Sequence, residues 1–147
     1  MMVTDYTITF PEGILGFPHI KRFVILEEES GSPLFRWLQA LDDPEVAFVV
    51  ADPAIFMPDY CEKIPVGERY PVALFDRTDG EADAPEKQPI LLVIITVPQE
   101  DPMKMSANLL GPLVINPQTR MAKQIVLSDE GYSSEHPVFN LVAAAMR

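Results

Sequence analysis

Residues 6–13 read YTITFPEG, and this stretch sets the pattern for the rest of the chain. Apolar and polar residues alternate in it, so Tyr6, Ile8 and Phe10 share one face of an extended backbone. Such alternation predicts a half-buried β-strand, and the Pro-Glu-Gly that follows is typical of a turn. We therefore expect a strand here with one face in the core.

Further along the chain, other short apolar stretches bounded by turn residues also predict strands. They are residues 23–27, 34–41, 46–51, 90–97, 105–110, 113–116 and 121–127. Residues 34–41 could form a short helix, but the turn residues on both sides favour a strand. The chain has 15 prolines, and long helices are mostly excluded because proline breaks helix interiors.

Only the C-terminal segment has the periodicity of a helix. Val138, Leu141, Val142 and Ala145 fall at i, i+3, i+4 and i+7. A chain of 147 residues is the usual size of one domain, so we expect residues 1–147 to form a single domain. The predicted fold is mainly β: a compact antiparallel β-sandwich or partly closed β-barrel with a short C-terminal helix.

The charge balance is strongly acidic, with 22 acidic residues against 11 basic ones. Binding of a phosphate backbone needs clustered Lys and Arg, and the only adjacent basic pair is Lys21 and Arg22. The sequence therefore predicts no direct nucleic-acid binding. An acidic surface does favour encounter with a basic protein, although it can also serve solubility alone.

Cysteine content and hydropathy predict a cytoplasmic protein without a membrane segment. The one cysteine, Cys61, cannot form an internal disulfide, and the first residues lack the pattern of a signal peptide. The longest apolar run, at residues 90–97, is far shorter than the roughly 20 residues of a membrane-spanning helix.

The sequence shows no pattern that predicts catalysis, a cofactor or a metal site. His19 and His136 lie far apart, and neither a phosphate-binding glycine loop nor a nucleophile elbow occurs. Asp79, Glu81 and Asp83 alternate as in a calcium loop, but residue 90 is Ile where that loop needs a bidentate Glu.

We therefore predict a non-enzymatic protein. The alternative from another class is a small β-barrel protein or enzyme that uses surface carboxylates to bind a cation or ligand. Those carboxylates would come from residues 76–83 and from Glu100 and Asp101.

Two apolar turns could either pack on the core or offer a binding surface. One holds Ile14, Leu15 and Phe17 between two predicted strands, and the other is residues 108–112, where Asn and Gly suit a tight turn. From the residue types alone, packing on the core is the favoured role.

Several motifs occur in a fixed order between about residues 6 and 139. They are residues 10–17 (FPEGILGF), 38–44 (LQALDDP) with Ala47 and Phe48, 52–53 (DP), 106–116 (SANLLGPLVIN), Gln124, Tyr132 and 136–137 (HP). In order and spacing they resemble the family of the flagellar assembly factor FliW.

This resemblance implies a regulator without catalytic activity that binds two proteins, flagellin and the RNA-binding translational regulator CsrA. It implies partner switching in the cytoplasm. Newly made flagellin holds the regulator in a chaperone-like complex, and secretion of flagellin frees the regulator to bind CsrA. CsrA repression of flagellin translation is thereby relieved. The acidic charge suits the CsrA step, because an RNA-binding protein is expected to carry basic surface.

The matched motifs also suggest where partners bind. The first candidate is the segment that contains Asn108, Leu109, Leu110, Gly111, Pro112, Leu113, Ile115 and Asn116, and the second is the turn that contains Ile14, Leu15 and Phe17. Residues 69–89 depart from the expected pattern and look inserted or rebuilt, so no family residue is transferred to them.

Overall fold

The computed structural model describes residues 7–27, 34–75, 88–129, 131–140 and 143. Its nine strands are β1 (Thr7–Thr9), β2 (Arg22–Glu27), β3 (Arg36–Ala40), β4 (Ala47–Ala51), β5 (Ile90–Thr96), β6 (Ser106–Ala107), β7 (Leu113–Ile115), β8 (Ala122–Gln124) and β9 (His136–Pro137). Its short helices are η2 (Pro53–Ile55), α1 (Tyr60–Lys63), α2 (Val66–Arg69) and η3 (Pro102–Lys104). The prediction of a mainly β, antiparallel protein is confirmed.

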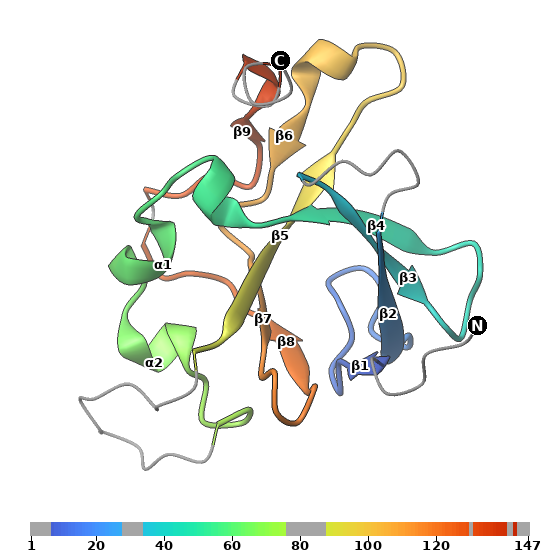
Figure 1. Ribbon diagram of the computed structural model, residues 1–147, viewed down its shortest axis with the longest axis vertical. Coiled ribbons are helices and arrows are strands. Elements are labelled where there is room, and N and C mark those ends of the chain that lie inside the picture. The colour runs from blue at the N-terminus through green and yellow to red at the C-terminus, as the bar shows by residue number, and fades with distance from the viewer. Residues whose placement is uncertain (1–6, 28–33, 76–87, 130, 141–142, 144–147) are drawn as a thin grey trace.

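The strands form one sheet with β5 at its centre (Figure 1). β1 to β5 follow one another as antiparallel neighbours. The chain then returns along β5 twice, first as β6 beside Ile95 and Thr96 and then as β7 beside residues 90–92. β8 continues the sheet from β7.

The sheet curls but does not close into a barrel. Thr9 at the end of β1 forms a parallel bridge with Met121, just before β8, and the Thr9 N–H donates to the Arg120 carbonyl at 3.0 Å. The strands that would complete the barrel thus meet at one point, which matches the partly closed form of the prediction.

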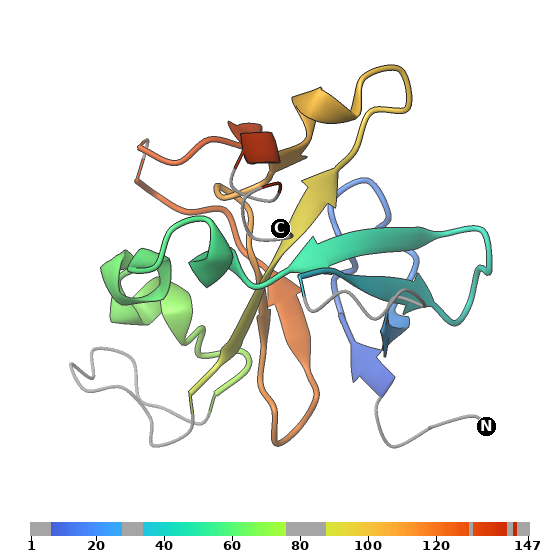
Figure 2. The same ribbon diagram turned by 45° about the horizontal axis from the view of Figure 1, so that its top comes forward.

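Two apolar clusters lie on opposite faces of this sheet. The inner cluster fills the curl of the sheet and consists of Ile8, Phe10, Ile14, Ile20, Phe23, Leu38, Ala40, Val50, Leu92, Leu113, Ile115 and Ala122. The outer cluster consists of Ala51, Phe56, Tyr60, Ile64, Tyr70, Leu74, Phe75, Leu91, Val93, Ile95, Ala107, Leu109, Val114, Leu127 and Val138. Figures 1 and 2 show α1 and α2 on one side of β5, away from β1 to β3, where their residues complete the outer cluster.

The alternation in residues 6–13 has the predicted result, because Ile8 and Phe10 are both buried in the inner cluster. The C-terminal helix is described only in part: Phe139, Asn140 and Ala143 are helical, whereas Leu141, Val142 and Ala145 lie outside the described residues. No described helix has both the length and the hydropathy needed to cross a bilayer.

Part of the atypical segment 69–89 belongs to the core. Tyr70, Leu74 and Phe75 are buried in the outer cluster, and the rings of Tyr70 and Phe75 meet edge to face with centroids 5.1 Å apart. Residues 76–87, which include the carboxylates of the calcium-like pattern, lie outside the described residues.

Candidate functional site

The side chain of Gln124 joins the two turns that the sequence singled out. Its Oε1 accepts the N–H of Leu15 at 2.9 Å, and its Nε2 donates to the carbonyl of Gly111 at 3.0 Å. Gln124 ends β8, which pairs with β7, so the hairpin places this amide between the two turns. Segments about 100 residues apart in sequence therefore lie side by side.

The first turn is held by its backbone and by two apolar anchors. The Phe17 N–H donates to the Ile14 carbonyl at 2.7 Å, while Gly13 and Gly16 have φ values of +70° and +89°, which favour glycine. Ile14 is buried in the inner cluster, and Phe17 packs edge to face on Phe48.

Leu15 lies between these anchors, and its side chain is 68% exposed. The turn thus holds a large apolar side chain in solvent while its neighbours fix the backbone.

The second turn is packed even more tightly. The Asn108 Oδ1 accepts the Gly111 N–H at 2.9 Å, in the manner of a turn-forming Asx side chain. A Cβ on Gly111 would lie 3.1 Å from Asn108 Nδ2 and 3.2 Å from Gln124 Nε2, so glycine lets the two amides approach. Leu109 is fully buried, and its carbonyl accepts the hydroxyl of Tyr60.

Burial controls the ionisation of that hydroxyl. Tyr60 lies in the outer cluster, and its ring meets the ring of Tyr132 edge to face at 5.3 Å. Removal of the phenol from water disfavours the phenolate, so the pKa of Tyr60 is raised. The hydroxyl therefore keeps its proton, and with it the bond to the Leu109 carbonyl, to a higher pH than the phenol of a solvent-exposed tyrosine would.

Beyond Gln124 the chain continues along the second turn and adds a second exposed apolar residue. The N–H groups of Ile125 and Leu127 donate to the carbonyls of Pro112 and Leu110. Leu127 is buried in the outer cluster, whereas Val126 is 61% exposed. We call exposed Leu15 and Val126, together with the partly buried Gln124 that bonds to the Leu15 backbone, the Gln124 patch.

The structure divides the predicted site residues into two groups. Leu15 is exposed, and Phe17, Asn108 and Leu110 are partly buried. The other predicted residues are buried and contribute to packing: Ile14, Leu109, Gly111, Pro112, Leu113, Ile115 and Asn116. A buried side chain reaches a partner only if the fold rearranges. The residues that could contact a partner directly are therefore those of the first group and of the Gln124 patch.

Sequence reasoning does not select Gln124 or Val126 as site residues. In the sequence, Gln124 is only one position of the family pattern, and Val126 is only part of an apolar run. The one signal in the sequence is that Gln124, a polar amide, interrupts the apolar run at residues 121–127. By itself this is weak evidence for a binding residue.

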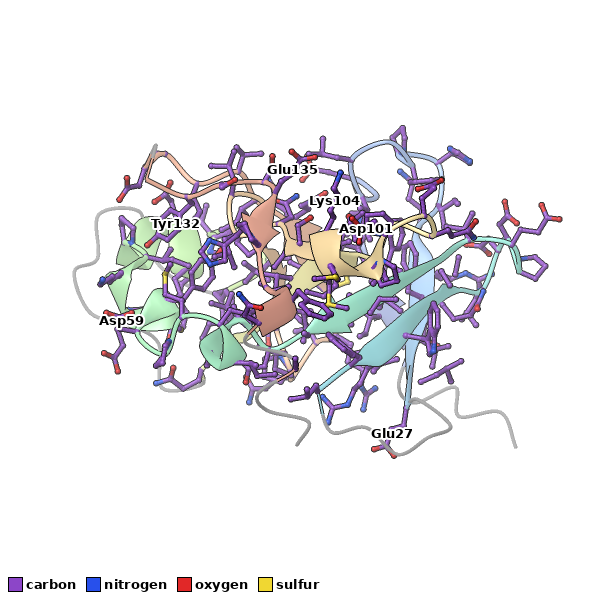
Figure 3. All side chains as sticks on the ribbon, turned by 90° about the horizontal axis from the view of Figure 1, so that it is seen from above. Glu27, Asp59, Asp101, Lys104, Tyr132 and Glu135 are labelled. Carbon is purple, nitrogen blue, oxygen red and sulfur yellow. The ribbon has the colours of Figure 1, made fainter. Side chains whose placement is uncertain are left out.

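The acidic side chains are dispersed over the surface. Figure 3 shows Glu27, Asp59 and Glu135 at separate parts of the periphery. Asp59 pairs with Lys63 at 2.9 Å, and Glu12 pairs with Lys123 at 3.1 Å. Within the described ranges, no group of three or more His, Cys, Asp or Glu side chains could hold a metal ion.

The comparisons with known proteins agree with one another. The family model for the FliW protein matches residues 2–138. A flagellar assembly factor FliW from Leptospira interrogans is 38% identical over 144 residues, which is 97% of this chain and 89% of that protein. The one from Natranaerobius thermophilus is 38% identical over 136 residues, or 92% and 83% of the two chains.

A solved structure extends this likeness to the fold. The crystal structure of a flagellar assembly factor FliW matches with a TM-score of 0.76 and 29% sequence identity, over 95% of this chain and 89% of that one.

Proposed function

Because the chain belongs to the FliW family of flagellar assembly factors, we propose that it regulates flagellar assembly by binding flagellin and the translational regulator CsrA. The flagellin complex keeps the protein occupied while flagellin is abundant in the cytoplasm. When secretion lowers the flagellin level, the freed protein binds CsrA and relieves repression of the flagellin message. The protein performs this role without catalysis.

The observation that carries the proposal is the Gln124 patch. Two apolar side chains, Leu15 and Val126, are exposed. The Leu15 N–H is bonded to Gln124, and the N–H groups on either side of Val126, those of Ile125 and Leu127, are bonded to the second turn. A backbone already held by hydrogen bonds loses less conformational entropy on binding, so apolar side chains on it are suited to act as anchors in an interface. The anchors fit the apolar face of an amphipathic helix such as a terminal helix of flagellin.

The acidic surface supports the second partner. The formal net charge is −11, and exposed acids such as Glu45, Glu62 and Glu100 lie on separate segments of the chain. Complementary charge raises the association rate with a basic protein and makes binding sensitive to salt. We therefore expect CsrA to associate faster and more tightly at low ionic strength.

The carboxylate alternative has less support. Asp101 Oδ1 accepts the Met103 N–H at 3.1 Å and so caps η3. That bond occupies one oxygen of the carboxylate in a structural role. A thermal-shift series with calcium, magnesium, manganese and zinc tests this alternative, since a bound cation raises the melting temperature.

Isothermal titration against a CsrA dimer and against flagellin tests the proposed function. We expect a stoichiometric complex with each protein, a CsrA affinity that falls as salt rises, and a CsrA isotherm altered by prior addition of flagellin. Absence of heat with both partners would contradict the proposal. Equal CsrA binding with and without flagellin would contradict the proposed partner switching, although the two separate complexes would still stand.

A further inference from the structure

The curled sheet has an open end, and its interior there is a cavity of about 380 Å³. Ile8 of β1, Ile25 of β2, Ile90 of β5 and Ile115 of β7 contribute to its wall. Among the described residues, Pro117, Glu27, Arg36 and Arg120 also line it. We call it the mouth cavity.

The cavity lies on the inner face of the sheet, next to the part of that face that the inner cluster covers. Successive residues of a strand point to opposite faces, so Ile25 follows Phe23 and Ile90 precedes Leu92 on the inner side. Phe23 and Leu92 are buried in the inner cluster, whereas Ile90 is 43% exposed. An interior position of the sheet therefore holds an isoleucine whose apolar surface remains in contact with water, at a free-energy cost that an apolar ligand would remove.

The rim adds a specific charge to this apolar space. Arg36 shares the inner side of β3 with Leu38, and it stands directly across from Glu27 in the β2–β3 register. The described side chains form ion pairs between Arg22 and Asp42, Lys63 and Asp59, and Lys123 and Glu12. Arg36 and Glu27 are not paired with each other in that set, so the Arg36 guanidinium has donors available for an anion.

The opposite wall is fixed by its backbone. Arg120 has a φ of 61°, its N–H donates to the Asn116 carbonyl at 2.7 Å, and its carbonyl accepts the Thr9 N–H at 3.0 Å. These bonds hold the β7–β8 turn against the end of β1. The wall of the mouth cavity at Arg120 and Pro117 is thus held in place by backbone hydrogen bonds.

We propose that the mouth cavity binds a small amphipathic carboxylate, namely a straight-chain fatty acid of medium length. The carboxylate pairs with the Arg36 guanidinium, and the alkyl chain lies among Ile8, Ile25, Ile90 and Ile115. The volume falls within the range of about 300–1,000 Å³ typical of small-ligand sites, and mouths of β-barrels are a common place for them. Glu27 at the rim repels the anion, so the attraction to the Arg36 guanidinium has to exceed that repulsion.

The test titrates the intact protein with sodium decanoate below its micelle concentration by calorimetry. We expect one decanoate per chain, with an affinity that rises from hexanoate to octanoate to decanoate by up to about fourfold per methylene. Decyltrimethylammonium, which has the same chain and the opposite charge, should bind at least about tenfold more weakly.

Two variants address the site without use of the partner proteins. Arg36→Gln should weaken decanoate binding by about tenfold or more, while Arg22→Gln, at an exposed arginine outside the cavity, should leave it unchanged. Ile90→Trp should fill the cavity and abolish binding, while Val72→Trp, at another exposed apolar residue, should not. Melting curves confirm that each variant is folded.

Absence of decanoate binding to the unaltered protein would overturn the proposal. Equal binding of decanoate to the folded Ile90→Trp variant would also overturn it, and so would equal binding of the cationic amphiphile. None of these outcomes bears on the binding of flagellin or CsrA.

Discussion

The Leu15 N–H and the Gln124 side-chain carbonyl meet at 2.9 Å across a sequence separation of 109 residues. The same amide donates to Gly111, so one side chain ties both predicted partner-facing turns to the end of β8. Loss of this link would release the turns from each other without removal of any core side chain.

Gln124→Ala tests that link. The Leu15 N–H and the Gly111 carbonyl both lose a partner, and we expect a loss of about 1–2 kcal/mol in the free energy of unfolding. Gln124→Glu keeps an acceptor for Leu15 but sets a carboxylate against the Gly111 carbonyl, so it should also destabilise. Urea denaturation measures both effects, with exposed Gln118→Ala as the control. If the Gln124→Ala variant is as stable as the unaltered protein, this amide has no structural role.

The two glycines of the first turn form a matched pair. A Cβ at Gly13 would lie 2.5 Å from the Phe17 carbonyl oxygen, whereas a Cβ at Gly16 would meet nothing within 4 Å. Both have positive φ, so Gly16→Ala should cost about 1–2 kcal/mol from backbone strain alone. Gly13→Ala adds a clash with backbone and should cost more, of order 3 kcal/mol or above. Chemical denaturation of the two variants gives the difference, and a smaller loss for Gly13→Ala would show that the turn can shift.

Tyr60→Phe removes the hydroxyl that donates to the Leu109 carbonyl. The carbonyl is left without this donor in the protein interior, and we expect a loss of about 1–3 kcal/mol at neutral pH.

The same residue predicts a dependence of stability on alkaline pH. Burial raises the pKa of Tyr60 in the folded state, so the folded protein keeps this proton after the unfolded chain has released it. The contribution to stability is full below the unfolded pKa of about 10 and falls above it, by about 1.4 kcal/mol per pH unit. The free energy of unfolding is measured by urea denaturation at pH 8 and pH 11. It should fall less between these two pH values for Tyr60→Phe than for the unaltered protein. Equal declines would contradict this assignment.

Asn116 illustrates where the sequence is sufficient and where it is not. Its position before Pro117 predicts an ordinary turn, and its Oδ1 does accept the Gln118 N–H at 2.9 Å. The Nδ2 atom, however, donates to the Leu74 carbonyl at 2.7 Å and so attaches part of the atypical segment 69–89 to the sheet. No local pattern indicates a bond between residues 42 positions apart.

The same distinction applies to the elements of the fold. Strands β1 to β5 were predictable because alternation or continuous apolar character is a local property of the chain. Helices α1 and α2 have four residues each, too few to show a helical period, and they form where Tyr60 and Ile64 pack into the outer cluster. The Gln124 patch was hidden for the same reason as the Asn116 bond, because its parts meet only in the folded chain.

The substitution Asn116→Asp tests the bond from Asn116 Nδ2 to the Leu74 carbonyl. The substitution keeps the acceptor for Gln118 but replaces the donor to Leu74 with a buried carboxylate oxygen. We expect a loss of about 2 kcal/mol or more at pH 7. The loss should shrink as the pH falls and the new carboxyl group gains a proton that can donate to the Leu74 carbonyl. Urea denaturation at pH 7 and pH 4.5, each relative to the unaltered protein at the same pH, measures the change. A loss that does not depend on pH would contradict the direct contact with Leu74.

The Gln124 patch makes the most direct functional prediction. Leu15→Asp and Val126→Asp replace exposed apolar side chains with charge, so they should leave the melting temperature nearly unchanged. Binding of a partner at this surface would have to remove the new carboxylate from water, which costs free energy. Met103, on η3, is 67% exposed, close to the 68% of Leu15, so Met103→Asp adds the same charge at a matched exposure elsewhere. We expect the two patch variants to bind flagellin at least about tenfold more weakly by calorimetry, and Met103→Asp to bind it normally. If CsrA binding falls instead, the patch belongs to the other partner. If both partners bind the folded patch variants as tightly as the Met103→Asp variant, the partner surface lies elsewhere on the sheet.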